Sequence, residues 1–158
     1  MGSPILRDPV TPPRADVLIM ESTYGDRDHR GMEQTLVELR SILKSAVETR
    51  TKVLIPAFAI GRTQQILYHI AEFIRAGELP KFPLFLDSPM AVHTTHLFEH
   101  HPGEHRLTNK DAHALTTSAT MVNSTDESKA LASRHGPMVI LSASGMATGG
   151  RVLHHMEH

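Results

Sequence analysis

Four short apolar runs, separated by segments of helical periodicity, constrain the fold of this chain more than any other feature. The runs are Val17–Met20, Lys52–Ile55, Phe82–Leu86 and Met138–Leu141. Continuously apolar strands are typical of parallel sheets whose two faces are both covered by helices. The segments between the runs would supply the helical crossovers that parallel strands need. The sequence therefore predicts an α/β fold of three layers, αβα, around a mostly parallel sheet.

The segments between the runs predict the helices and the remaining elements. One helical face after Gly31 carries Leu36, Leu39, Ile42, Leu43 and Val47, and a second amphipathic helix begins near Gly61. The further expected elements are a helix from Pro89 to about His100, a loop or lid over His101–Thr117, a short strand over Ala119–Val122, a helix over Ser124–Ser133, a small-residue turn over Ser142–Gly150 and a helix over Arg151–Glu157. Ser124 and Glu127 have the spacing of a capping box for the helix that they begin.

Composition places the chain among ordinary globular domains. Its 158 residues fit one domain, with a Pro-rich extended lead-in over 1–15 and the folded domain over 16–158. No cysteine is present, which excludes disulfides and thiolate metal sites and favours a cytoplasmic location. A formal net charge of -1 limits any nucleic-acid contact to a local patch. No apolar run is long enough for a membrane helix, so no membrane partner is expected.

Unusual residues follow each apolar run, where parallel strands would end. These segments are Glu21–Gly25, Pro56–Thr63, Asp87–Met90 and Ser142–Arg151. Ligands of parallel α/β sheets gather at this edge, against the positive N-termini of the next helices. The residues favour an anionic ligand there, with Arg62 and Arg151 as charge-assisted donors. Tight helix–sheet packing without a ligand explains the glycine-rich turns equally well.

The familiar catalytic motifs are missing from the sequence. It contains no Gly-x-Ser-x-Gly elbow, no phosphate-binding P-loop and no His-Glu-x-x-His or His-x-His-x-Asp-His motif. Two pairs, His93 with His96 and His155 with His158, have the spacing of one helix face. A catalytic zinc ion normally needs three protein ligands, so incidental histidines are the favoured interpretation and no metal site is predicted.

Four blocks of sequence together resemble one known family. Ala15–His29 resembles the start of the β-CASP region of metallo-β-lactamase-fold nucleases. Ile55–Gln64, Leu86–Ala91 and then Leu141–Met146 with Gly149–His155 resemble its later blocks in the same order. The best-known members of that family are the RNA 3′-processing endonuclease of the cleavage and polyadenylation complex, its bacterial and archaeal homologues, and RNase J. The resemblance implies a Rossmann-like β-CASP domain inserted within a metallo-β-lactamase domain.

The resemblance also implies a function. The domain would be the substrate-binding cap of a zinc-dependent ribonuclease, and single-stranded RNA would pass between the cap and the metallo-β-lactamase domain of the same polypeptide. Two Zn²⁺ ions are expected in the full-length parent, on motifs before residue 1 and after residue 158. The chain alone is therefore expected to be inactive, and its sheet is expected to lack its final strands. The alternatives are a non-catalytic RNA-binding or homodimerising module, and the cap of a hydrolase for another phosphoester.

The same resemblance selects candidate site residues. Glu21 occupies the position of an acidic motif that supports the active site through a later histidine, which this chain lacks. Arg62 is expected to contact phosphate, because a guanidinium matches phosphate geometry. The other candidate substrate or phosphate contacts are Tyr24, His29, Ser88, Ser144, Gly145 and Met146.

Structural alternatives remain for several of these residues. Glu21 could instead accept hydrogen bonds from nearby backbone amides, and Ser88 and Ser144 could act only as helix caps. Tyr24 and Phe58 are candidates for stacking on bases, but core packing is the favoured interpretation of Phe58. For His29, an ion pair within its own loop is an equal alternative to a ligand contact.

Overall fold

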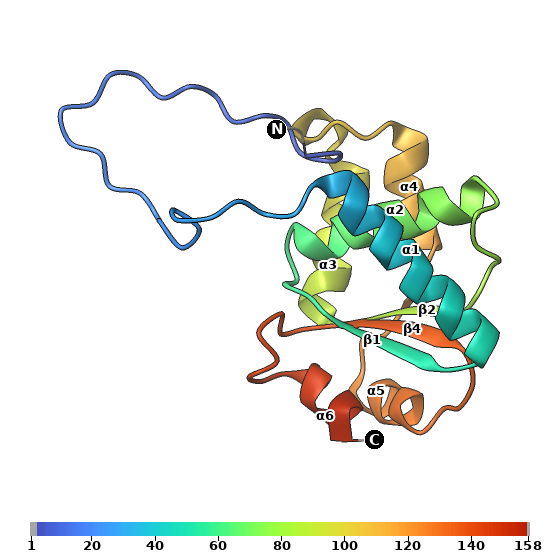
Figure 1. The fold of residues 1–158 in the computed structure, drawn as a ribbon. Helices are drawn as coiled ribbons and strands as arrows, with labels where there is room; N and C mark the ends of the chain where they lie inside the picture. The colour runs from blue at the N-terminus through green and yellow to red at the C-terminus, as the bar shows by residue number, and fades with distance from the viewer. Residues whose placement is uncertain (1–2, 158) are drawn as a thin grey trace.

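The computed structural model describes residues 3–157, which form one parallel sheet with helices on both faces (Figure 1). The sheet has four strands in the order β1-β4-β2-β3, and every neighbouring pair is parallel. The strands are β1 (Lys52–Pro56), β2 (Leu84–Asp87), β3 (Thr120–Met121) and β4 (Met138–Ser142). The predicted three-layer αβα architecture is confirmed.

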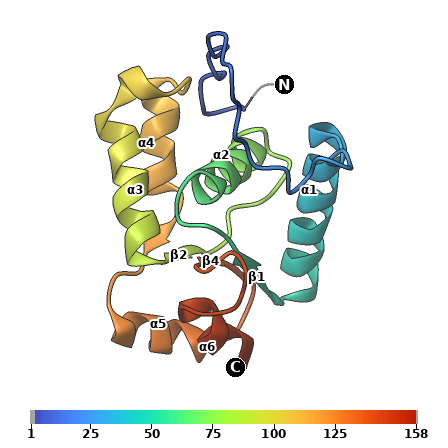
Figure 2. The ribbon, with the colours of Figure 1, turned by 90° about the vertical axis from the view of Figure 1, so that its left-hand side faces the viewer.

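The helices divide unequally between the two faces of the sheet (Figures 1 and 2). One face carries α1 (Met32–Thr49), α2 (Arg62–Arg75), α3 (Pro89–His100) and α4 (Asn109–Thr117), with the 3₁₀ turn η1 (Pro102–Glu104) between the last two. The other face carries α5 (Thr125–Ala132) and α6 (Arg151–Glu157). No helix of the described part is long and apolar enough to cross a membrane.

Alternate residues of β4 enter two separate cores. Val139 and Leu141 join the larger core, on the side of α1–α4, whereas Met138 and Ile140 join a smaller one that includes Leu131 of α5. Successive side chains of a strand point to opposite faces, so a strand between two helical layers must be apolar throughout. This explains why the run from 138 to 141 shows no polar alternation.

The two central strands send the chain to opposite faces of the sheet. After β2 it enters α3 on one face, and after the adjacent β4 it enters α6 on the other. Asp87 and Ser142, the last residues of these strands, are paired in register. A crevice forms where neighbouring connections diverge in this way, and it is the usual ligand position in doubly wound sheets.

The predicted strand at Val17–Met20 is wrong. These residues form no strand, and their exposed fractions lie between 69% and 93%. Both faces of the sheet are already covered, and no strand of the described chain pairs with this segment. The segment lies in the wide loop 7–31, which projects away from the sheet and helices (Figure 1). An apolar run indicates only that a segment can be buried; it does not identify a strand with which the segment pairs.

The predicted loop or lid at His101–Thr117 is also wrong, because it contains η1 and α4. Thr108 caps α4 by accepting a hydrogen bond from the backbone N–H of Asp111 over 3.2 Å. Ala112 and Leu115, spaced for one helix face, enter the core. The helix is short, and its two buried positions are too few to show a clear period.

Smaller corrections concern boundaries and one helix face. The strand predicted from Phe82 begins at Leu84, since Pro83 has no N–H for the ladder. The strand predicted over Ala119–Val122 narrows to the two residues of β3. On α1, Ile42 is exposed although it was expected on the buried face.

The beginning of the described chain is held against the segment between η1 and α4. Ile5 is buried, and its carbonyl accepts a hydrogen bond from the backbone N–H of Arg106 over 2.9 Å. The predicted lead-in therefore has one fixed point before the wide loop begins. Residues 1, 2 and 158 lie outside the described residues, and so does the prediction that pairs His158 with His155.

Candidate ligand site at the carboxyl edge of the sheet

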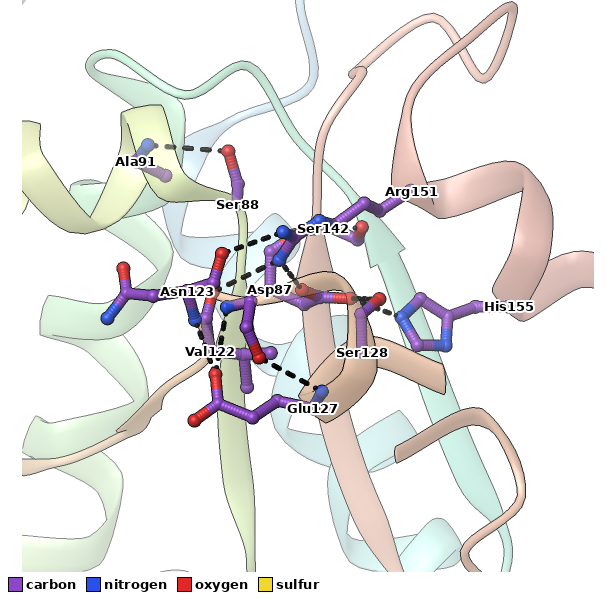
Figure 3. A network of polar contacts seen from close by, with 11 residues as sticks. Asp87, Ser88, Ala91, Val122, Asn123, Glu127, Ser128, Ser142, Arg151 and His155 are labelled. Carbon is purple, nitrogen blue, oxygen red and sulfur yellow. Dashed lines mark hydrogen bonds and ion pairs between the residues drawn. The ribbon is translucent and has the colours of Figure 1, made fainter. Parts of the chain in front are cut away.

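Asp87 is the buried centre of a polar network at the end of β2 (Figure 3). The residue is inaccessible to solvent, and its carboxylate accepts three hydrogen bonds. Ser128 of α5 donates its hydroxyl over 2.5 Å, Nη1 of Arg151 donates over 2.6 Å, and Nε2 of His155 donates over 2.6 Å. Both Arg151 and His155 belong to α6, so one carboxylate joins the sheet to both helices of the smaller layer.

Arg151 extends this network to the end of β3. Its Nη1 also donates to the carbonyl of Val122 over 3.2 Å, and its Nη2 donates to the carbonyl of Asn123 over 2.8 Å. The guanidinium that was expected to bind an anionic ligand is thus engaged by the protein itself. The positive charge of Arg151 balances the charge of the buried carboxylate, and its hydrogen bonds to Val122 and Asn123 stabilise the turn into α5.

Asp87 is ionised in this setting. Burial alone would raise the pKa of Asp87, but the hydrogen bonds from His155, Ser128 and Arg151 and the nearby guanidinium charge outweigh burial and lower it. A buried carboxylate with three donors and a cationic partner is well satisfied. The network therefore stabilises the edge as a rigid unit and offers no free carboxylate for proton transfer.

His155 is oriented by the same carboxylate. Because a carboxylate only accepts hydrogen bonds, Nε2 carries the proton that is shared with Asp87. Its Nδ1 is buried and has no hydrogen-bond partner among the described residues. A substrate cannot reach this atom in the present arrangement. Within residues 3–157 no three histidine, aspartate or glutamate side chains lie close enough to hold a metal ion. We assign no metal-dependent step to these described residues.

Two loops meet at the carboxyl edge of the sheet, where β1 and β4 end. The loop after β1 is joined to the sheet through the N–H of Ala57, which donates to the carbonyl of Ser142 over 3.0 Å. The loop after β4 then passes directly over Phe58. A Cβ atom built on Gly145 would lie 2.8 Å from the backbone nitrogen of Phe58, closer than real contacts allow. Gly145 is thus required for the close approach of the two loops.

The structure places five of the predicted site residues along this edge, though it does not test their roles. Arg62 is exposed at the first turn of α2, and its Nη1 donates to Gln65 over 3.2 Å. Met146 is exposed, and Ser144 and Gly145 are half-buried in the loop after β4. Ser88 is buried and caps α3 by accepting from the N–H of Ala91 over 3.3 Å, which is the alternative role expected for it.

The other three predicted site residues lie in the loop 7–31 and are exposed. Glu21 accepts a hydrogen bond from the N–H of Thr23 over 2.8 Å, as the structural alternative expected. The rings of Tyr24 and His29 lie 4.1 Å apart between centroids. Within the described residues these side chains interact with one another or with their own loop, and none of them forms a hydrogen bond or ion pair with the sheet edge. Their proposed contacts with a substrate stay predictions.

Sequence reasoning overlooked the residues that organise the edge, Asp87, Ser128 and His155. One signal was available, because an aspartate ends a strand of three buried apolar residues and so must carry its charge into the fold. Arg151 and His155, four residues apart, also lie on one helix face. His155 was interpreted as a surface or incidental histidine in preference to a metal ligand; its side chain is in fact buried, and it donates to a buried carboxylate.

The topology defines a doubly wound parallel α/β domain in which the connections after β2 and β4 diverge to opposite faces of the sheet. A family model described as the Beta-Casp domain matches residues 63–158, more than half of the chain. The chain therefore belongs to the Beta-Casp family, which confirms the family resemblance.

Three curated relatives indicate the range of this family. The chain is 41% identical to Ribonuclease TTHA0252 of Thermus thermophilus, over 98% of its own length and 37% of that protein. It is 34% identical to an RNase J-like protein of Methanocaldococcus jannaschii, over 90% of the chain and 34% of the relative. It is 30% identical to Transcription termination factor FttA of a Lokiarchaeum species, over 92% of the chain and 24% of the relative. The chain thus spans little more than a third of these relatives, or less.

Proposed function

We propose that the chain is the substrate-binding cap of a metal-dependent ribonuclease. The observation that carries the proposal is the position of Arg62, an exposed guanidinium at the N-terminus of α2 on the carboxyl edge of the sheet, one residue before the segment that the Beta-Casp model matches. A relative named as a ribonuclease supports RNA as the ligand. Helix N-terminal amides and a guanidinium suit the phosphates of a single strand. Its cytoplasmic location stays a prediction.

The chemistry of the parent protein lies outside these residues. Metal-activated water would hydrolyse the phosphodiester bond, and the two Zn²⁺ ions expected from the resemblance would be held by a metallo-β-lactamase domain of the same polypeptide. The residues described here would bind the RNA backbone and form one wall of the cleft. In this proposal Glu21, Tyr24 and His29 belong to the seam between the two domains.

A non-catalytic module is the second candidate. The termination-factor relatives favour it, since their name describes an action on transcription and no hydrolysis. In that case the same edge would bind RNA, or pair with a second copy of the chain, without any cleavage nearby. The cap and the RNA-binding form of this module both require an anion-binding edge, so binding is tested before cleavage.

Binding is tested with a fluorescently labelled single-stranded RNA and two matched arginine variants. Arg62→Gln removes the guanidinium at the carboxyl edge, and Arg50→Gln removes one at the opposite, amino edge before β1. We expect Arg62→Gln to weaken binding and to lower the slope of log affinity against log salt by about 0.7, the value for one phosphate contact on a single strand. Equal effects of the two variants would contradict the placement of the phosphate site.

Cleavage distinguishes the cap from an independent enzyme. The purified chain, incubated with labelled RNA and Zn²⁺, is expected to leave the RNA intact. Metal-dependent cleavage that disappears in Glu21→Ala would show that the chain carries its own chemistry and would overturn the assignment as a cap. An Asp28→Ala variant, altered in the same exposed loop, serves as the control.

A further inference from the structure

Phe58 is the one exposed phenylalanine among the described residues. Its exposed fraction is 56%, whereas Phe73 and Phe85 are buried and Phe82 and Phe98 are half-buried. The core packing predicted for Phe58 is therefore wrong. An exposed aromatic ring at the carboxyl edge of the sheet calls for a physical reason.

The loop that displays Phe58 is held in place by two buried polar side chains. Oγ1 of Thr63 donates to the carbonyl of Phe58 over 2.8 Å, and Nε2 of Gln64 donates to the carbonyl of Ala59 over 3.1 Å. Oε1 of Gln64 accepts from the N–H of Gly61 over 2.8 Å. Thr63 and Gln64 are both inside the protein. The exposure of Phe58 is thus fixed by the fold and does not come from a slack loop.

The ring is also supported from one side. A Cβ atom on Gly145 would lie 3.0 Å from Cδ2 of Phe58, so the ring lies against bare backbone at that point. Next to it, Met146 is 68% exposed. One side of the ring is therefore braced by the loop after β4, and the rest is open to solvent.

We propose that Phe58 is a stacking platform for a nucleobase of single-stranded RNA, with Arg62 on the neighbouring phosphate. This inference rests on the proposed function and adds a second type of contact to it. Single strands are bound by aromatic rings under the bases together with cations along the backbone. Phe58 and Arg62 place one of each within a five-residue segment at the N-terminus of α2. A preorganised ring favours such stacking because little side-chain entropy remains to be lost.

A single tryptophan tests the geometry directly, because the chain contains none. Phe58→Trp places one fluorophore at the platform, and Leu97→Trp places one on the last turn of α3 as a matched exposed control. Each variant is titrated with an oligoadenylate and with an abasic ribose-phosphate oligomer of the same length. We expect quenching of the Phe58→Trp signal by the oligoadenylate alone, and none for Leu97→Trp. Equal quenching by the abasic oligomer would refute stacking.

Affinity provides an independent readout. Phe58→Ala is expected to weaken oligoadenylate binding roughly 5- to 100-fold, the usual contribution of one stacked base, and to leave abasic binding unchanged. Phe58→Tyr should retain the affinity. Gly145→Ala should lower it by displacing the ring, whereas Gly149→Ala, which has open space around it, should not.

The outcomes separate this inference from the proposed function. If the wild-type chain binds neither oligomer in a salt-dependent manner, the proposed function fails. If it binds both equally and Phe58→Ala changes nothing, the phosphate contact stands and the stacking inference is overturned. If Phe58→Ala instead reduces self-association in sedimentation without affecting RNA, a protein surface covers the ring and the inference is likewise overturned.

Discussion

Replacement of Asp87 by alanine should be among the most damaging single substitutions in this domain. The carboxylate accepts hydrogen bonds from Ser128, Arg151 and His155. A hydrogen bond to a charged group contributes roughly 1.5–3 kcal/mol, so three would amount to about 4.5–9 kcal/mol. The Arg151 side chain is 20% exposed and can recover water, which lowers this figure. We expect a loss of about 3–5 kcal/mol, as for other broken buried ion pairs.

Thermal and urea unfolding, followed by far-ultraviolet circular dichroism, measure this loss. For a domain of this size the Asp87→Ala melting temperature should fall by roughly 10 °C. Asp28 is exposed in the loop 7–31, so Asp28→Ala should change stability by no more than about 0.5 kcal/mol. Similar melting temperatures for the two variants would refute the central role assigned to the Asp87 network.

Asp87→Asn refines the same test. Its amide oxygen can still accept from Arg151, and its NH₂ group would face Ser128 and His155, each of which can accept in another rotamer or tautomer. The asparagine variant should therefore be more stable than the alanine variant.

The pKa of Asp87 is lowered in the fold, so the stability from its charge is complete above the unfolded value of about 3.9 and is lost as pH falls through the folded value. The gap between wild type and Asp87→Asn should narrow in acid, and a gap that widens would contradict the ionised assignment.

Three further predictions concern single positions. Gly150→Ala should lower the free energy of unfolding by at least about 1–2 kcal/mol, because Gly150 has a φ of 80° and a Cβ would lie 2.6 Å from the carbonyl oxygen of Ala143. Gly149 has open space around it, so Gly149→Ala is the control in the same unfolding experiment. Ser124→Ala removes the side-chain cap of α5 and should cost about 1 kcal/mol in urea unfolding, and no change would show that the cap is dispensable. Burial lowers the pKa of His69, so stability should decline as pH falls below its unfolded value of about 6.5 and level off below the folded value. His69→Leu should flatten that slope in melts at pH 5–7, and an unchanged slope would assign it to other groups.

The sequence predicted the elements whose signals are local. β4 is apolar throughout because both its faces are buried, and the run 138–141 needed no knowledge of its neighbours. The capping box of α5 is confirmed, with Ser124 accepting from the N–H of Glu127 and Glu127 accepting in return. The strand at Val17–Met20 fails for the opposite reason, because pairing depends on a partner that an apolar pattern cannot identify.

The organisation of the candidate site could not be predicted in the same way. Asp87 finds its three partners 41, 64 and 68 residues further along the chain. Those contacts arise only after α5 and α6 have packed on one face of the sheet. Phe58 shows the same limit, since its ring is exposed because two buried side chains fix the backbone of its loop. The sequence indicates which edge carries the unusual residues, but not which of them face inward.

At the carboxyl edge of the sheet, different residues are expected to carry stability and the proposed RNA binding. Asp87 pairs with Arg151, which also donates to backbone carbonyls, so truncating either side chain should lower the stability of the domain. Phe58 is exposed on the loop before α2 and Arg62 on the first turn of that helix, so truncating either side chain should weaken the proposed RNA binding and leave unfolding nearly unchanged. A rigid lower layer is what allows an exposed ring to keep one position, because the loop after β4 that braces Phe58 leads directly into the helix that Asp87 anchors. Destabilisation at Asp87 should therefore also weaken RNA binding, whereas substitution of Phe58 should leave the melting temperature near that of wild type.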